Sequence, residues 1–165
     1  MCIGIIGIEK EGRTLTEPIL KERLEQKESL SVPLFGYELI REELITDLLG
    51  KDTPDLLYWA GKRLARKYPL TDYDDVISFF AQAGWGLLTI KNNKKNEIIF
   101  ELESEMIKER LKTNPNSTYH LEAGFLAQQI EFQTEAITEA FEHPKKKAAK
   151  VQFTVKWDLA DPIVK

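Results

Sequence analysis

The stretch that decides the predicted fold is Tyr119-His-Leu-Glu-Ala-Gly-Phe-Leu-Ala-Gln-Gln-Ile-Glu-Phe132. Its apolar residues recur at steps of three and four, which is the spacing of a helix. They form two adjacent stripes, so we expect a helix wedged between two layers instead of one lying on a surface. Gly124 stands in the middle, where it costs about 1 kcal/mol relative to alanine. A glycine at such a position indicates that another backbone comes close.

The composition describes a soluble globular chain of one domain. It has 165 residues, of which 42% are hydrophobic and 30% charged, as in ordinary globular proteins. A net charge of −4 argues against a nucleic-acid partner. Cys2 is the single cysteine, which excludes a disulfide within the chain and favours a reducing compartment. The apolar start, Met1 to Ile8, is too short for a membrane span, so we expect a cytoplasmic protein.

Helix signals come before strand signals along the chain. Residues 1–33 are predicted to be a poorly ordered or loosely packed leader, and residues 34–165 a single domain. We expect helices over Tyr37–Leu49, from Thr53-Pro54 onward, and over Thr71–Gln82, with Thr71 and Asp74 forming a capping box. Another helix begins at Ser104 and precedes the central one.

Strand patterns occupy the rest of the chain. A hairpin is predicted from Trp85–Lys91 and Glu97–Leu102, and further strands over Ala136–Phe141 and Lys150–Asp158. The last of these alternates strictly between apolar and polar residues, which is typical of antiparallel sheets with one wet face. The predicted fold class is therefore α+β: an antiparallel sheet of about four strands, covered by helices in a sandwich-like layout.

Reactive groups do not converge in the sequence. His120 and His143 have no second ligand at metal-binding spacing, and no phosphate-binding glycine loop is present. Glu101, Glu103 and Glu105 alternate near a strand end, which is more typical of a solvated face than of acid–base catalysis. The basic run Lys145–Lys147, with Lys150 nearby, is best explained as a turn between strands. We therefore expect neither catalysis nor a bound metal or cofactor.

Four short motifs carry a family resemblance over roughly Gly36 to Pro162. They are Tyr58-Trp-Ala-Gly61, Ala83-Gly-Trp-Gly86, Leu121-Glu-Ala-Gly-Phe125 and Val155-Lys-Trp-Asp158. In this order they resemble the 4-vinyl reductase domain, whose superfamily also contains the small TRAPP vesicle-tethering subunits and heme nitric oxide sensors. Most specifically, the chain resembles the YslB family of small bacterial proteins, which has no assigned activity.

The resemblance implies a fold of the nitric oxide signalling and Golgi transport ligand-binding type. It also implies dimers formed through the early helices and, in some relatives, a pocket for a small molecule or lipid. The reactive groups of those relatives are missing here. The segment Phe141–Val151 lacks the cysteines of the vinyl reductase type, and the Tyr-x-Ser-x-Arg clamp of heme sensors is absent. Fold is therefore expected to be shared while function is not.

These observations favour a non-catalytic cytoplasmic module that forms a homodimer and binds a small apolar ligand or a protein partner. The helix Tyr37–Leu49 is apolar enough to bury against a second copy. The residues expected to line a pocket are Trp59, Gly61, Trp85, Gly124 and Phe125. The alternative is a sensor that binds heme or another small molecule, with His120 as the iron ligand.

Overall fold

Four strands form one antiparallel sheet in the computed structural model, which describes residues 31–162. They are β1 (Leu87–Lys94), β2 (Glu97–Glu103), β3 (Ala136–Lys145) and β4 (Lys150–Pro162), and their order across the sheet is β1-β2-β4-β3. The α+β class with a four-stranded antiparallel sheet is thus confirmed. The leader predicted over residues 1–33 lies almost entirely outside the described residues.

The helices follow the sequence pattern with two differences. The first predicted helix begins earlier and is split into α2 (Leu34–Glu38), a π-helical turn η1 (Leu39–Leu44) and α3 (Ile45–Leu49). It ends at Gly50, whose φ of 61° lies in the left-handed region. After the short η2 (Gly50–Asp52) come α4 (Thr53–Lys67), α5 (Tyr73–Gln82), α6 (Glu105–Thr113) and α7 (His120–Thr134), with η3 (Lys146–Ala148) between the last two strands.

The predicted cap of α5 was wrong by one residue. Asp72 is the N-cap, and its carboxylate accepts a hydrogen bond from the Asp75 backbone N–H at 2.9 Å. The hydroxyl of Thr71 instead donates to the Asp75 carboxylate at 2.6 Å. The N-cap of α5 is thus Asp72 instead of the predicted Thr71.

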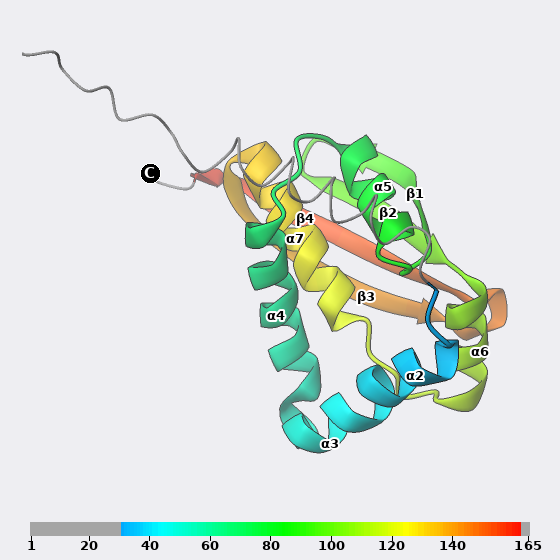
Figure 1. Cartoon of the computed structure of the whole chain (residues 1–165). Coiled ribbons are helices and arrows are strands. Elements are labelled where there is room, and N and C mark those ends of the chain that lie inside the picture. Colours follow the sequence, from blue (N-terminus) through cyan, green and yellow to red (C-terminus); the bar gives the residue numbers. More distant parts are fainter. Residues whose placement is uncertain (1–30, 163–165) are drawn as a thin grey trace, which may run out of the picture. The chain divides into compact units, whose positions relative to one another are not determined.

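Helix α7 lies on the β3–β4 side of the sheet, with α4 packed against it (Figure 1). All residues from Glu122 to Ile130 are buried, which confirms the prediction of a helix between two layers. On the sheet, the residues that face α7 and its neighbours alternate with exposed ones; Phe100, Phe153 and Val155 are fully buried.

Two glycines bring α4 and α7 into backbone contact. A Cβ atom added to Gly124 would lie 1.9 Å from the Tyr58 carbonyl oxygen, and one added to Gly61 would lie 2.1 Å from the Leu121 carbonyl oxygen. Any side chain larger than hydrogen at either position would force the helices apart. The close approach predicted at Gly124 is therefore present, and α4 is the backbone that approaches.

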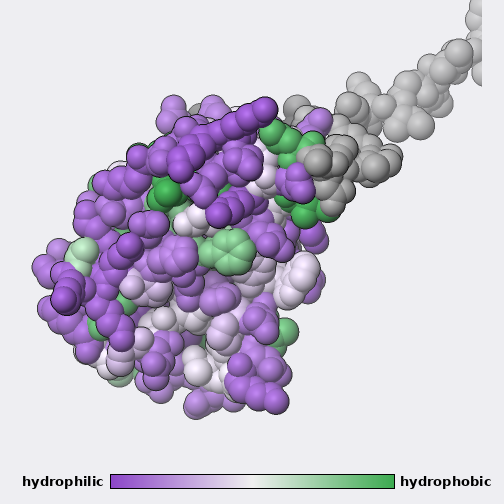
Figure 2. Space-filling model, turned by 180° about the vertical axis from the view of Figure 1, so that it is seen from behind, coloured by the Kyte–Doolittle hydropathy of each residue, from purple (hydrophilic) through white to green (hydrophobic). Residues whose placement is uncertain are grey.

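The other face of the sheet is hydrophilic, as the view from behind shows (Figure 2). Lys150 bridges Glu101 at 3.0 Å and Glu103 at 2.9 Å, and Lys91 also reaches Glu101. Lys156 and Lys94 pair with Glu97 in the same way. These ion pairs engage two of the three glutamates considered for catalysis, Glu101 and Glu103, and the lysine near the basic run, Lys150, and they mark a solvated face.

The free edge of β3 is closed by side chains from α4 and α7. Lys62 donates to the Thr138 carbonyl, Glu131 accepts from the Thr138 N–H, and Tyr58 accepts from the Ala140 N–H at 3.0 Å. An exposed edge strand is normally a template for pairing with another chain. Here three backbone groups of β3, at Thr138 and Ala140, already have side-chain partners.

Candidate binding surfaces

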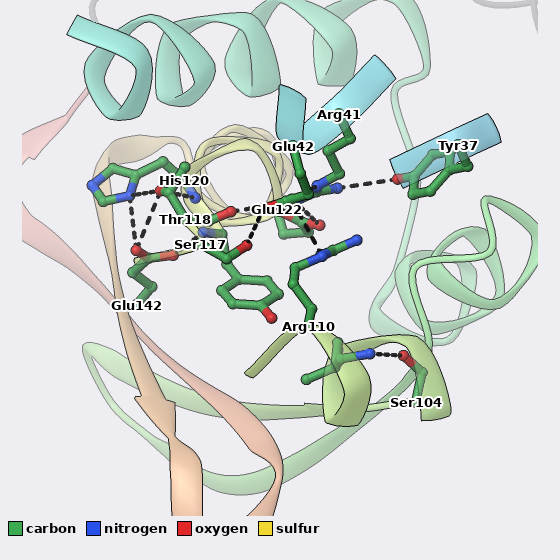
Figure 3. A network of polar contacts seen from close by, with 12 residues as sticks. Tyr37, Arg41, Glu42, Ser104, Arg110, Ser117, Thr118, His120, Glu122 and Glu142 are labelled. Carbon is green, nitrogen blue, oxygen red and sulfur yellow. Dashed lines mark hydrogen bonds and ion pairs between the residues drawn. The ribbon is translucent and has the colours of Figure 1, made fainter. Parts of the chain in front are cut away.

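A buried ion network holds the N-terminal helical segment, residues 34–49, against the domain (Figure 3). The guanidinium of Arg41 lies 2.7 Å from the Glu122 carboxylate, and both residues are buried. Arg41 also contacts the Tyr37 hydroxyl and the Thr118 carbonyl. Burial alone would lower the pKa of Arg41, but the Glu122 carboxylate outweighs it and the pKa is raised. The Arg41 guanidinium therefore stays charged.

Arg110 of α6 makes a second set of contacts in the same network. Its guanidinium lies 2.6 Å from the carboxylate of Glu38 and 3.2 Å from that of Glu42. Glu42 in turn accepts from the Ser117 hydroxyl at 2.7 Å and from the Asn114 amide at 3.1 Å. Removing one partner from such a buried set leaves an uncompensated charge, which costs about 3–5 kcal/mol. The network thus fixes which side of the segment faces inward.

The inward side of this segment is polar and its outward side is apolar. Arg41 is its only buried residue, whereas Ile40, Leu44 and Leu48 are 57%, 52% and 74% exposed. These three residues, four apart, form what we call the outer stripe. A surface helix normally buries its apolar face. In this segment the outer stripe is exposed instead.

An open hollow of about 670 Å³ lies between α4 and β3. Its walls carry Trp59, Ile137 and Phe141, which are 59%, 48% and 49% exposed. The ammonium of Lys62 lies 5.9 Å from the centre of the Trp59 ring. Exposed aromatic residues of this kind are enriched at binding sites, because they offer a large contact area with few rotatable bonds.

His120 also lines this α4–β3 hollow. Figure 3 shows its ring beside Glu142. Its Nδ1 atom lies 3.0 Å from the Glu142 carboxylate and 2.6 Å from the Thr118 hydroxyl. The other Glu142 oxygen accepts from the Tyr119 N–H. The hydrogen bond with Glu142 raises the pKa of His120, although partial burial opposes it. With Nδ1 engaged by the carboxylate, Nε2 is the ring nitrogen left for a ligand.

The predicted pocket residues occupy three different places. Trp59 lines the α4–β3 hollow, and Gly61 and Gly124 lie at the crossing of α4 and α7. Trp85 and Phe125 are buried in an aromatic cluster, with ring centres 5.4 Å apart. Phe79 stacks on Phe125 at 4.6 Å in the same cluster. The structure therefore does not bring the five residues together around one space.

The histidine and carboxylate side chains of the described residues were expected to bind no metal. Within residues 31–162, no group of three histidine, cysteine or carboxylate side chains is placed to hold a metal ion. Thr118 and Glu142 both contact the same nitrogen of His120, whereas a catalytic triad uses opposite nitrogens. In the same range, no helix is long and apolar enough to cross a membrane.

Two isolated charges in the sequence are a signal for the ion network. Arg41 is the only cation between Val32 and Gly50, and Glu122 is the only charge in the apolar run from Leu121 to Ile130. A lone arginine in one apolar helix and a lone glutamate in another are costly to bury unless they meet. Pairing such isolated charges would have predicted the contact.

Two solved structures share this arrangement of helices on a sheet. A vinyl-4-reductase family protein from Methanocaldococcus jannaschii matches with a TM-score of 0.60, over 94% of this chain and 99% of that one, at 19% identity. The phenol-responsive sensory domain of the transcription activator PoxR, solved with phenol, matches with a TM-score of 0.54 over 78% and 76%, at 11% identity. The class of protein is thus an α+β domain with the vinyl-4-reductase fold.

Within this fold the chain belongs to the family described as protein of unknown function (DUF2507), whose model matches residues 34–156. It is 45% identical over 140 residues to the uncharacterized protein YslB of Bacillus subtilis (strain 168). The alignment covers 85% of this chain and 95% of that protein. The resemblance to the YslB family predicted from the four motifs is confirmed.

Proposed function

We propose that this protein is a non-catalytic cytoplasmic binding module whose N-terminal helical segment pairs with the same segment of a second copy. The observation that carries the proposal is the inverted segment, with Arg41 inside and the outer stripe of Ile40, Leu44 and Leu48 outside. Because the ion network fixes the inward side, the segment cannot turn its leucines into its own core. A second copy offers the same apolar stripe in return, which is the condition for a two-fold symmetric contact.

The pairing is tested by the mass of the protein in solution. We expect a dimer by light scattering at about 50 μM, well above a dissociation constant near 1 μM. Leu44→Lys places a charge in the centre of the stripe and should give a monomer. The control is Leu87→Lys on β1, where the side chain is equally exposed, at 53%, and lies away from the stripe. A monomeric wild-type chain, or equal effects of the two substitutions, would reject the pairing.

The binding role has a second part, a small apolar ligand. It is supported by the exposed Trp59 and Phe141 in the α4–β3 hollow and by the relation in fold to a phenol-responsive domain. Phenol is therefore the first probe. In an NMR titration, the indole N–H signal of Trp59 should shift, while those of the buried Trp85 and Trp157 stay in place.

The two possible sites give different results in that titration. A shift of the Trp85 signal would place the ligand in the aromatic cluster, as our pocket prediction had it. If none of the three tryptophan signals moves, this protein does not bind phenol. Trp59→Ala should abolish the response without lowering the melting temperature, because the side chain is mostly exposed.

The alternative, a heme-binding sensor, has weaker support. The imidazoles of His120 and His143 line the hollow, and so do the carboxylates of Asp55, Glu139 and Glu142. Negative side chains oppose the propionates of heme, so these residues do not fit the group. A strong Soret band in the freshly purified protein, lost in His120→Ala, would nevertheless establish it.

A further inference from the structure

A second hollow, of about 520 Å³, runs between the N-terminal helical segment and α6. We call it the acidic groove. It is lined by residues from Leu34 to Asp47 on one side, a stretch of roughly 20 Å at 1.5 Å per helical residue, and by α6 residues on the other. The outer stripe does not line it, since Ile40, Leu44 and Leu48 are absent from its walls. The groove is thus a separate surface.

The floor of the acidic groove is apolar. Leu34, Phe35 and Leu39 are 50%, 73% and 43% exposed there, and Met106 of α6 meets them from the opposite wall. Apolar groups from two helices with a channel between them form the kind of surface that accepts one face of a third helix. The side chain of methionine adapts to such a partner more readily than a branched one.

The walls are strongly acidic. Five carboxylates line the groove, from Glu38, Glu42, Glu43, Asp47 and Glu109, against a single guanidinium. That guanidinium, of Arg110, is already held by two of the five at 2.6 and 3.2 Å. Glu109 pairs with Lys112 at 2.9 Å.

Glu43 and Asp47 are the two acids on which the charge of the groove depends. They are exposed, they stand one turn apart on the same wall, and in the described part of the chain neither has an ion-pair partner. A positively charged partner is the one whose charge complements them. The π-helical turn η1 falls between Leu39 and Leu44, within this wall, and such turns occur frequently at functional sites.

From the apolar floor and the acidic walls, we infer that the acidic groove binds a basic amphipathic helix of a partner protein. An anionic membrane surface or a nucleic acid would be repelled by the five carboxylates. Strand addition is not offered here, because both walls are helical. A second copy of the N-terminal helical segment would bring its own Glu43 and Asp47 toward these walls. This inference names the partner for the binding role proposed above and rests on that role, but it does not depend on pairing.

The probe is a synthetic fourteen-residue peptide of roughly four turns, with leucine at helical spacing on one face and lysine on the other. Its control has the same composition in an order that breaks the leucine face. Binding of the fluorescein-labelled peptides is followed by anisotropy. The amphipathic peptide should bind, the scrambled one should bind at least about tenfold more weakly, and added salt should weaken binding.

Matched variants of the full chain locate the site. Glu43→Lys with Asp47→Lys reverses the free charges of the groove and should weaken peptide binding at least about tenfold, which corresponds to 1.4 kcal/mol. Asp74→Lys with Asp52→Lys makes the same change in net charge at exposed positions outside the groove and outside the α4–β3 hollow, and should have less than about a threefold effect. Phe35→Ala tests the floor through a side chain that is mostly exposed, so it should weaken binding without unfolding the chain.

Each other result overturns the inference. If the wild-type chain does not bind the amphipathic peptide, or binds both peptides equally, the groove does not recognise such a helix. Equal losses in the two charge-reversal variants mean that net charge alone attracts the peptide. A change of oligomeric state in the groove variant makes a second copy the occupant. Leu44→Lys distinguishes this inference from the pairing, because that chain should be monomeric and still bind the peptide.

Discussion

Replacing Gly124 by alanine should separate α4 from α7 and destabilise the domain. The new Cβ atom would lie 1.9 Å from the Tyr58 carbonyl oxygen, whereas ordinary contact begins at 3.4 Å, so the helices must move apart by about 1.5 Å. Overpacking costs typically about 1–3 kcal/mol, and the upper end applies because a backbone atom cannot rotate away. Alanine returns about 1 kcal/mol through its higher helix propensity. The net loss is therefore about 2 kcal/mol.

Thermal unfolding followed by circular dichroism measures this loss. For a domain of this size, about 2 kcal/mol lowers the melting temperature by roughly 4–10 °C. Gly36→Ala is the matched control, because Gly36 also lies in a helix, α2, and an added Cβ there meets nothing within 4 Å. It should leave stability unchanged or raise it by up to about 1 kcal/mol. Equal melting temperatures for Gly124→Ala and the wild type would refute the helix contact.

Three further changes test the contacts that orient the surfaces. Glu122→Gln leaves the Arg41 guanidinium buried without its carboxylate and should cost about 3 kcal/mol in urea unfolding; adding Arg41→Met should recover much of it. Glu142 raises the pKa of His120, so the His120–Glu142 pair stabilises the fold fully below the ordinary pKa of 6.5 and loses its effect as pH rises through the raised pKa. The free energy of unfolding of the wild type should therefore exceed that of His120→Gln by less and less from about pH 6 to pH 9. Tyr58→Phe removes the acceptor of the Ala140 amide and should cost about 1 kcal/mol, with faster hydrogen exchange at that amide as the readout.

The layers of the fold could be predicted because local pattern and tertiary contact agree there. The strict alternation from Val151 to Trp157 gives a sheet with one wet face, and the charge ladder on β2 and β4 is that face. Gly124 within an apolar helix indicated a close backbone, although only the structure identifies Tyr58 as the contact.

The candidate surfaces were harder to predict because they depend on which side of a helix faces inward. The apolar pattern predicted a helix in segment 34–49. It did not predict that the buried Arg41 would set which side of this segment faces the domain. Hydrophobicity likewise predicted Trp85 and Phe125 to line a pocket, although both lie in the core. The sequence does not distinguish an aromatic residue in the core from one that binds a ligand, because the residue types are the same. Trp59 could be told apart from them only by its exposure.

The closed edge of β3 has a consequence for how this protein can assemble. Because Tyr58, Lys62 and Glu131 already occupy backbone groups of Thr138 and Ala140, another chain cannot extend the sheet there without first displacing three side chains. Edge-to-edge pairing through this part of the strand is thereby opposed. Contacts between molecules at this part of the edge are left to side chains, whose shape and charge discriminate among partners in a way that a bare backbone ladder does not.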